Sequence, residues 1–277
     1  MPLAPRTPHA PSVLWFVRHG ESASNVARFA ALAAGSETVD VAWPDHDVPL
    51  SPLGERQATA LGRWFAIQPP EQRPTVVLAS PFARAWETAR RIVAEGGTAS
   101  GATGEAATAC ILRDERWREK ELGLFHDLMR AGVQQRHPEQ WALREHLGMF
   151  WYRPPNGESG ADVATRVRAA LDAVAVRFAG ERVLVVCHQV TILCARYVLE
   201  GLTERELEES WRAFDLANCS VTSYRPDADG QLALARLNFT VPVEAEGERV
   251  TAEPDATESG LGHAMANVPS SLPLKVP

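Results

Sequence analysis

Short apolar runs that alternate with longer amphipathic stretches are the main pattern along this chain. Four of the runs are strand-like, at Val13–Val17, Thr75–Ala79, Thr108–Leu112 and Val183–Cys187. A run of four to six branched or aromatic residues between turn signals is typical of a buried parallel strand. Helical patterns separate the runs, so the chain is predicted to form a doubly wound α/β sheet.

Helix start signals support this alternation. Ser51-Pro52 and Ser80-Pro81 each place an N-cap serine before a proline at the first helical position. Ser159 and Thr203 each precede an acidic residue by three positions, which fits the capping-box pattern. We therefore expect a helix to begin at each of these four positions.

The two ends of the chain differ from its middle. Prolines without an apolar pattern occupy residues 1–11, which are predicted to form a disordered extension. Residues 12–240 are predicted to form one domain, which ends with a hairpin between Cys219–Arg225 and Gln231–Phe239. Acidic, proline and small polar residues dominate 241–277, which is expected to be a loosely ordered tail.

Composition narrows the classes of partner and the compartment. The formal net charge of -7 and the pI of about 5.7 argue against a general affinity for nucleic acid or an anionic membrane. The chain has no apolar leader and no run of 18 apolar residues, so neither secretion nor membrane spanning is expected. Its four cysteines form no CxxC pair, which suits a reducing cytoplasm.

Two histidines follow two of the predicted strands. Arg18-His19-Gly20-Glu21-Ser22 comes directly after the first strand, and His188 comes directly after the last. Ligands of open α/β sheets bind outside the carboxyl ends of the strands. Both histidines are therefore expected to face one crevice.

Residues around this crevice suit phosphoryl chemistry, which needs positioned cations, a nucleophile and a proton for the leaving oxygen. Neutral His19 can attack phosphorus, and Gly20 lets the backbone approach an anion. Arg84, in the first turn after the second strand, can hold a phosphate through two hydrogen bonds. His188, with the amide of Gln189, can contact the phosphoryl group from the opposite side. Taken singly, each residue also fits an ordinary surface or core role.

Two further points concern the proton donor and a metal site. Glu119 can protonate a leaving alkoxide if burial raises its pKa, but the residues alone do not separate it from Glu115 or Glu121. The histidines at 126, 137 and 146 match no metal-ligand spacing, so no metal site and no cofactor are predicted.

An ordered set of motifs resembles the histidine phosphatase superfamily, the phosphoglycerate mutase-like family, branch 1. The resemblance covers roughly Leu14 to Phe239. Its motifs are Arg18-His19-Gly20-Glu21-Ser22 with Asn25, Leu50-Ser51-Pro52-Leu53-Gly54, Ser80-Pro81 with Arg84-Ala85 and Thr88-Ala89, Glu119 four before Gly123, Gly157-Glu158-Ser159, and Val186-Cys187-His188. Such an ordered set is far more specific than a single triplet.

The resemblance implies a three-layer α/β/α fold and a two-step, metal-independent reaction. It implies that His19 becomes phosphohistidine and that Glu119, selected by its spacing to Gly123, donates the proton and then helps water to attack. The phosphoryl group is expected to bind to a set of polar residues: Arg18, Ser22, Asn25, Arg84, His188 and Gln189.

Departures from the family pattern affect the expected substrate. Gln189 stands where the family commonly has glycine, and His-Gln is similar to the bisphosphatase domain that acts on fructose 2,6-bisphosphate. The chain lacks the Phe-Thr-Gly-Trp segment of glycolytic mutases, so hydrolysis of a small phosphomonoester is favoured over intramolecular transfer. The alternatives are a phosphoglycerate mutase-type transfer and a non-catalytic phospho-ligand module. The substrate within this class and the oligomeric state, with a dimer among the options, stay open.

Overall fold

The computed structural model describes residues 10–252 except 105–106, 108–109 and 214. The described strands form one sheet in the order β3-β2-β4-β1-β5-β6. The first four pair in parallel, β5 pairs antiparallel with β1, and β6 pairs antiparallel with β5. Their bounds are Val13–Arg18 (β1), Val76–Ala79 (β2), Leu112–Arg113 (β3), Arg182–Cys187 (β4), Val221–Pro226 (β5) and Leu232–Phe239 (β6). The predicted mostly parallel sheet is confirmed.

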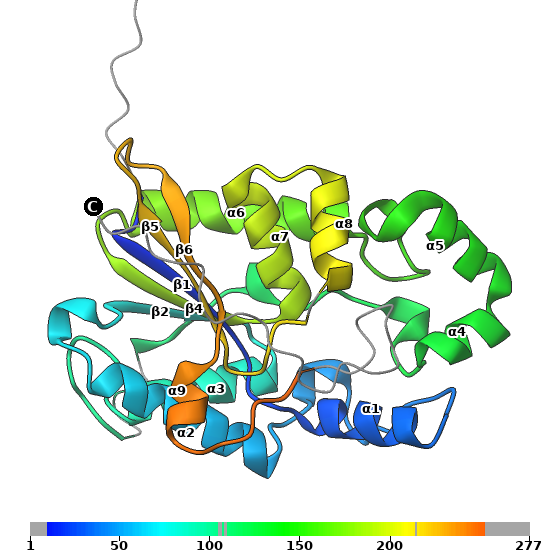
Figure 1. Ribbon diagram of the computed structural model, residues 1–277, viewed down its shortest axis with the longest axis horizontal. Helices are drawn as coiled ribbons and strands as arrows, with labels where there is room; N and C mark the ends of the chain where they lie inside the picture. Colours follow the sequence, from blue (N-terminus) through cyan, green and yellow to red (C-terminus); the bar gives the residue numbers. More distant parts are fainter. Residues whose placement is uncertain (1–9, 105–106, 108–109, 214, 253–277) are drawn as a thin grey trace, which may run out of the picture.

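Helices cover both faces of this sheet, which gives the expected three-layer α/β/α arrangement (Figure 1). One face carries α2 (Pro52–Ala66), α3 (Ala83–Ala94) and α9 (Val241–Ala245), and the other carries α6 (Gly160–Arg177), α7 (Gln189–Glu200) and α8 (Glu204–Ala213). Beyond the carboxyl ends of the parallel strands lie α1 (Ala23–Ala33), α4 (Arg130–Arg136) and α5 (Pro138–Trp151) (Figure 1). No helix among the described residues is long and apolar enough to cross a bilayer.

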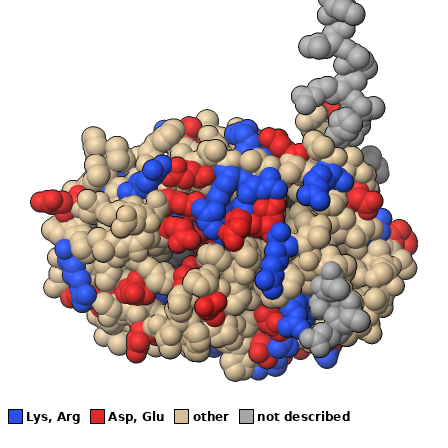
Figure 2. Space-filling view, turned by 180° about the vertical axis from the view of Figure 1, so that it is seen from behind, with Lys and Arg blue, Asp and Glu red and all other residues tan. Residues whose placement is uncertain are grey.

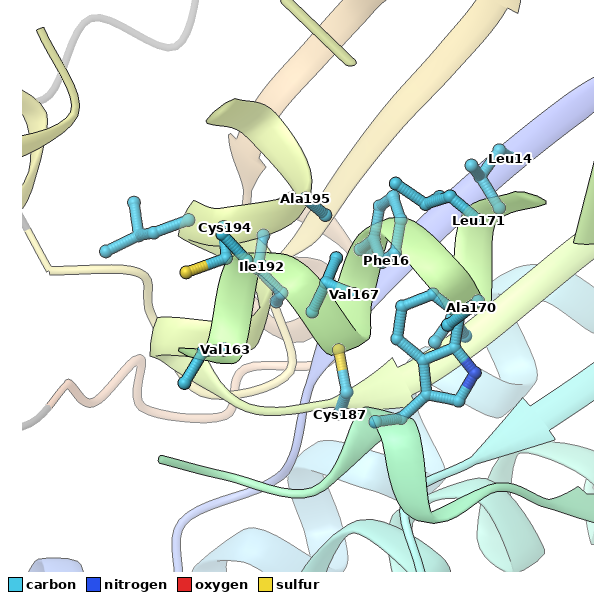
Figure 3. Packing of buried hydrophobic residues seen from close by; sticks show 14 of the residues in the cluster. Leu14, Phe16, Val163, Val167, Ala170, Leu171, Cys187, Ile192, Cys194 and Ala195 are labelled. Carbon is cyan, nitrogen blue, oxygen red and sulfur yellow. The ribbon is translucent and has the colours of Figure 1, made fainter. Parts of the chain in front are cut away.

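Alternation along β1 divides the core in two. Leu14 and Phe16 pack with α6 and α7, as Figure 3 shows, whereas Trp15 and Val17 face α2 and α3. Successive side chains of a strand point to opposite faces, so one short run anchors both helical layers. Each fully buried side chain of this size contributes about 1.5–3 kcal/mol to folding.

Three of the four predicted helix starts are confirmed. The Ser51 hydroxyl accepts a hydrogen bond from the Gly54 amide at 3.0 Å, with a proline at the start of α2. Ser159 forms a capping box at the start of α6, and Thr203 exchanges hydrogen bonds with Glu206 at the start of α8. Side-chain caps of this kind satisfy amides that the first turn leaves free.

The fourth predicted start, at Ser80-Pro81, is wrong. Helix α3 begins at Ala83, and its N-cap is Phe82, which makes no side-chain cap. The Ser80 hydroxyl instead lies 2.8 Å from His188 Nε2 and accepts from the Phe82 amide at 3.3 Å. The serine that looked like a cap therefore belongs to the strand-end site.

The predicted strand Thr108–Leu112 is also corrected. The structure has a two-residue strand, β3, paired with Leu78 and Ala79 at the edge of the sheet. Both of its residues are exposed, and residues 108–109 lie outside the described part of the chain. Ile111 is buried without belonging to a strand, so burial of a single side chain accounts for the apolar signal here.

Residues just outside both predicted domain limits pack against the domain. Near the start, the Ala10 carbonyl accepts from the Gly180 amide and Pro11 is buried. At the other end, 241–252 is not a loose tail: Val243 is buried in the α2–α3 layer, and Thr251 is buried beside the strand ends. Residues 1–9 and 253–277 lie outside the described residues. Although acidic and small residues dominate the composition of 241–252, Val243 packs in the core and Thr251 makes buried hydrogen bonds.

Candidate active site

The carboxyl ends of β1 and β4 bring the two predicted histidines together. Arg18 pairs with Cys187 in the parallel register, and the His19 amide donates to the Cys187 carbonyl at 3.0 Å. The ring centroids of His19 and His188 are therefore 5.1 Å apart. The two rings thus lie side by side at the strand ends, and both are buried.

His19 is held as a buried imidazole with one engaged nitrogen. Its Nδ1 lies 2.7 Å from the Gly20 carbonyl, an acceptor, so the proton is assigned to Nδ1 and the lone pair to Nε2. Burial, followed by the charges of Arg84 and Arg18, lowers the pKa of His19 well below its ordinary value. A neutral ring with a free Nε2 has the protonation state that a nucleophile needs.

His188 is the N-cap of α7 and is fully buried. Its Nε2 lies 2.8 Å from the Ser80 hydroxyl, and its ring packs edge-on against Phe82 with centroids 5.3 Å apart. Burial and then the charge of Arg84 lower the pKa of His188 well below its ordinary value. The second histidine is therefore also a neutral, oriented hydrogen-bonding group.

Two buried arginines supply positive charge to this pair of histidines. Arg84, in the first turn of α3, donates to the Asp45 carbonyl at 2.6 Å and pairs with the Asp45 carboxylate at 3.0 Å. Arg18 donates from Nη1 to the Leu216 carbonyl. Both guanidinium groups act on the pKa of each histidine, which places all four groups within electrostatic reach of one another. Fixed cations of this kind stabilise charge on a phosphoryl group.

Two glycines allow the turn after β1 to form. A Cβ atom on Gly20 would lie 2.5 Å from the Gly54 carbonyl oxygen, and one on Gly54 would lie 1.9 Å from the Glu21 carbonyl oxygen. No larger residue fits where the two backbones cross. The start of α2 is thereby pressed against the loop that carries His19.

Ser22 and Asn25, both predicted to bind phosphate, form the capping box of α1. The Ser22 hydroxyl donates to Asn25 Oδ1 at 3.0 Å and accepts from the Asn25 amide at 3.2 Å. Asn25 Oδ1 also accepts from Asn218 Nδ2 at 3.4 Å, which ties it to the His19 loop. The Ser22 hydroxyl is thus engaged within the helix cap, where it orients Asn25.

Gln189, the unusual residue after His188, begins α7. Its side-chain Nε2 donates to Asp215 Oδ1 at 2.9 Å, while its buried Oε1 has no hydrogen-bond partner among the described residues. Asp215 adjoins Leu216, the acceptor for Arg18. Gln189 therefore lies beside the phosphate-binding candidates, with its side-chain amide N–H directed to Asp215.

The structure separates Glu119 from its acidic neighbours. Its Oε1 accepts from the Lys120 amide at 2.8 Å, and its Oε2 accepts from the Val190 amide at 3.4 Å, close to His188. Burial raises the pKa of Glu119, although these amides and the charges of Arg84 and Arg166 oppose the shift. Glu115 is exposed, and Glu121 faces Arg118. Glu119 is thus the carboxyl of the three that bonds to the start of α7, two residues after His188.

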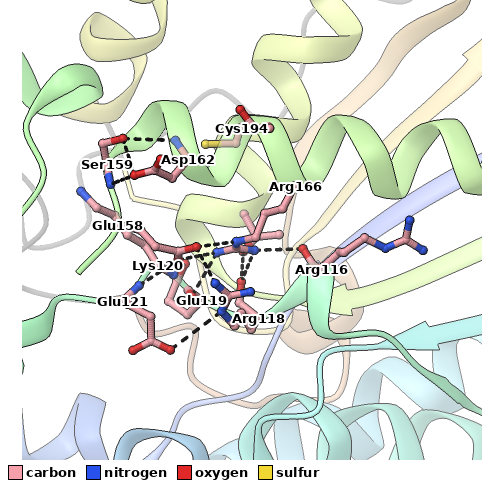
Figure 4. Close-up of polar contacts among 12 residues, drawn as sticks. Arg116, Arg118, Glu119, Lys120, Glu121, Glu158, Ser159, Asp162, Arg166 and Cys194 are labelled. Atoms are coloured by element: carbon pink, nitrogen blue, oxygen red, sulfur yellow. Dashed lines mark hydrogen bonds and ion pairs between the residues drawn. The ribbon is translucent and has the colours of Figure 1, made fainter. Parts of the chain in front are cut away.

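A guanidinium group holds the loop that carries Glu119 (Figure 4). Arg166, on α6, donates to the carbonyls of residues 116, 118 and 119 at 2.9, 2.8 and 3.1 Å. It also pairs with Glu158 at 3.0 Å, and Glu158 accepts from the Glu121 amide at 3.2 Å and from Arg118 at 2.6 Å. This set of residues fixes the backbone on both sides of the acid.

Sequence reasoning missed several residues that the site uses. These are Asp45 beside Arg84, Thr88 beside the Gly20 amide, Asn218 beside the His19 carbonyl, Arg166, and Ser80 in its contact with His188. Thr88 and Ser80 stood in the motifs, which was a usable signal. The others act over long sequence separations and carry no local pattern.

The surface of the molecule carries both signs of charge. On the face shown in Figure 2, basic and acidic side chains are intermingled. Several pairs join α2, α3 and the segment after α9, including Arg63 with Glu95 and Arg56 with Glu248. No group of three or more His, Cys, Asp or Glu side chains within the described residues is arranged to hold a metal ion.

Comparisons with known proteins agree with this geometry. The model of the histidine phosphatase superfamily (branch 1) matches residues 14–240. A probable phosphoglycerate mutase GpmB of Yersinia enterocolitica is 28% identical over 211 residues, which are 76% of this chain and 82% of that protein.

Solved structures match the fold. A mycobacterial glucosyl-3-phosphoglycerate phosphatase is similar with a TM-score of 0.62 and 24% identity, over 82% of this chain and 99% of that one. The alpha-ribazole phosphatase of Shigella flexneri gives a TM-score of 0.62 and 19% identity, over 82% and 96% of the two chains. At these identities the likeness concerns the fold. The family match, which spans most of the chain, shows that the protein belongs to branch 1 of the histidine phosphatase superfamily.

Proposed function

We propose that the chain is a metal-independent phosphatase that hydrolyses a small phosphomonoester through a phosphohistidine on His19. The observation that carries the proposal is the buried, neutral His19, whose Nδ1 is engaged by the Gly20 carbonyl while Arg18, Arg84 and His188 surround the ring. A binding module would need the cations but neither an activated nucleophile nor an acid. A cytoplasmic location is part of this proposal.

The first step transfers the phosphoryl group to the enzyme. His19 Nε2 attacks phosphorus, the bond from phosphorus to the leaving oxygen breaks, and protonated Glu119 gives its proton to that oxygen. Arg18, Arg84 and His188 hydrogen-bond to the phosphoryl oxygens, whose charge they stabilise. The products of this step are a free alcohol, phosphohistidine and a Glu119 carboxylate.

The second step restores the enzyme. A water molecule attacks phosphorus, its proton passes to the Glu119 carboxylate, and the bond between phosphorus and His19 Nε2 breaks. Inorganic phosphate leaves, His19 is neutral again and Glu119 is again protonated. Splitting one difficult transfer into two easier ones is the gain from covalent catalysis.

A phosphoglycerate mutase activity is the alternative, because the Yersinia relative carries that name. In a mutase, the phosphohistidine returns its group to a second hydroxyl of the substrate instead of to water. The two activities differ in their products, since a mutase yields an isomer and little inorganic phosphate.

One experiment tests both functions. Phosphate release and isomerisation are measured in EDTA on phosphoglycerates, a sugar phosphate, a nucleoside monophosphate, a phosphoserine peptide and p-nitrophenyl phosphate. Wild type is compared with His19→Ala and with His146→Ala, a matched control at an exposed histidine of α5. Phosphate release that requires His19 and resists EDTA is the expected result.

Other outcomes would contradict the proposal in distinct ways. Isomerisation without phosphate release would establish the mutase. Binding of phosphate without turnover would leave a non-catalytic module, and strong inhibition by EDTA would indicate a metal mechanism. Activity retained in His19→Ala would remove the nucleophile.

A further inference from the structure

The segment after α9 reaches the loop that carries His19. We define the strap as residues 241–252, which follow β6 and lie beyond the family match at 14–240. The strap packs on α2 through Val243 and ends beside the strand-end site at Thr251. The strap residues that make these contacts lie outside the matched family region.

Two peptide groups on either side of Gly20 determine where the His19 ring lies. The first joins His19 to Gly20: its carbonyl accepts from Asn218 Nδ2 at 3.0 Å, and its amide donates to the Thr88 hydroxyl at 3.0 Å. The second joins Gly20 to Glu21: its carbonyl contacts His19 Nδ1 at 2.7 Å, and its amide donates to Gln57 Oε1 at 2.9 Å. Both peptides are therefore held at both ends.

Side-chain amides of Asn218 and Gln57 provide one hold on each peptide. Both residues are fully buried. An amide side chain can rotate by half a turn and exchange its oxygen for its nitrogen, which would replace an attractive contact with a repulsive one. Something must therefore fix the orientation of each amide.

The Thr251 hydroxyl contacts both amides. It donates to Asn218 Oδ1 at 3.0 Å and accepts from Gln57 Nε2 at 3.0 Å. The backbone of the strap adds to this, because the Thr251 carbonyl accepts from the Asn218 amide at 2.7 Å and the Arg249 carbonyl accepts from Gln57 Nε2 at 2.8 Å. One hydroxyl thus bonds to both of the amides that hold the His19 loop, and with the Arg249 carbonyl it favours the observed orientation of each.

We propose that Thr251 is a positioning residue for phosphoryl transfer, which acts through Asn218 and Gln57 to hold His19 in its attacking orientation. The inference rests on the proposed function for its kinetic consequence. Loss of the hydroxyl removes the donor to Asn218 Oδ1 and one of the two acceptors of Gln57 Nε2, so both amides are held less firmly. The free nitrogen of His19 then spends less time aligned with phosphorus. A displacement of this kind slows the chemical step and leaves phosphate binding by the arginines nearly unchanged.

The test compares three threonine variants. Thr251→Val removes the hydroxyl and keeps the shape, and Thr251→Ser keeps the hydroxyl. Thr240→Val removes the hydroxyl of the residue just before the strap, which donates to Glu244. The single-turnover rate of phosphohistidine formation, KM and the melting temperature are measured for each. We expect Thr251→Val to be about tenfold slower with KM within twofold, and the other two variants to stay within twofold of wild type.

Two results would overturn the proposal. One is a Thr251→Val variant as fast as wild type, and the other is a loss shared by Thr251→Ser that follows the fall in melting temperature. Should Thr251→Val fail to fold, Thr251→Ala in the full chain replaces it, with Thr251→Ser as its control. Equal transfer rates in Thr251→Ala and wild type would refute the role of Thr251.

Nitrogen NMR of the His19 ring separates this inference from the proposed function. Should wild type release no phosphate, the proposed function fails, and the nitrogen resonances of the His19 ring still report its orientation in wild type and Thr251→Val. Protonation at Nδ1 in wild type, and mixed or exchanging protonation in the variant, is the expected spectrum. Identical spectra would refute the positioning role.

Discussion

Under the proposed function, one wall of the site faces the phosphoryl group and one loop faces the leaving group, and these two regions are built differently. Arg18, His19, Arg84 and His188 are each at most 5% exposed and stand at strand ends or in the first turn of a helix. Glu119 is half-buried on an irregular loop, which is held by carbonyl contacts to Arg166. The wall derives its rigidity from the sheet, and the loop derives its rigidity from one guanidinium group.

This difference suits the two tasks. A phosphoryl group is the same in every phosphomonoester, so a rigid, preorganised wall serves all substrates. Leaving groups differ in size and pKa, so an acid on a loop outside the sheet can be adapted to each of them. Specificity is therefore expected to reside on the loop side, and general phosphoryl chemistry on the wall.

The largest effect is expected from a substitution on the loop, which should leave the wall intact. Glu119→Gln removes the acid, so kcat on alkyl phosphates should fall about 10³-fold, because an alkoxide leaves poorly without a proton. Activated aryl phosphates, whose leaving groups need no proton, should lose less than about tenfold. Comparing alkyl and p-nitrophenyl phosphate measures this, and Glu115→Gln, at an exposed glutamate of the same region, is the matched control.

The pH profile provides a second readout for Glu119. Burial raises its pKa, and kcat/KM on alkyl phosphates should fall as pH rises through that raised pKa because the acid loses its proton. Burial lowers the pKa of His19, so the nucleophile stays neutral well below pH 6.5 and activity should persist there. An alkaline limb that survives in Glu119→Gln would assign the proton to another group.

A smaller effect is expected from a substitution in the wall, where kcat/KM should fall equally for every substrate. Arg84→Gln removes a cation next to both histidines and should lower kcat/KM about 10²-fold on alkyl and aryl phosphates. Arg90→Gln, on the same helix but paired with Glu87 at the surface, is the control. A loss confined to alkyl phosphates would place Arg84 with the leaving group.

The wall was easier to predict from sequence than the loop, for a physical reason. His19 and His188 follow apolar runs, and a parallel sheet brings its strand ends to one edge, so local pattern and topology locate them. Arg166 donates to the backbone carbonyl of Glu119, 47 residues away, and Arg84 donates to the backbone carbonyl of Asp45, 39 residues away. Any residue can supply a carbonyl, so the partner leaves no trace in the sequence.

The same reasoning explains two of the segments whose structure differs from the prediction. The Ser80-Pro81 pair has the composition of a helix cap, but the serine hydroxyl is drawn to a histidine 108 residues away. Residues 241–252 have the composition of a tail, yet a few buried contacts hold them to the domain. Local composition measures the average environment of a segment and misses one or two decisive long-range bonds.

The smallest effect is expected from a substitution that weakens the support of the loop and keeps Glu119 in place in the sequence. Arg166→Lys retains the positive charge near Glu158 but replaces the planar group that contacts three carbonyls with a single ammonium. The Glu119 carboxyl should then be misplaced for part of the time, with kcat on alkyl phosphates about tenfold lower and aryl phosphates within twofold.

Arg168→Lys, at an exposed position of the same helix, is the control for general effects on α6. Parallel losses on alkyl and aryl phosphates would mean that Arg166 supports the wall as well as the loop, and the two regions would then be one mechanical unit. Selective loss on alkyl phosphates, by contrast, requires that the acid moves while His19 and its cations stay in place. Only separate supports for the two sides allow that result, because a shared support would transmit the disturbance to both.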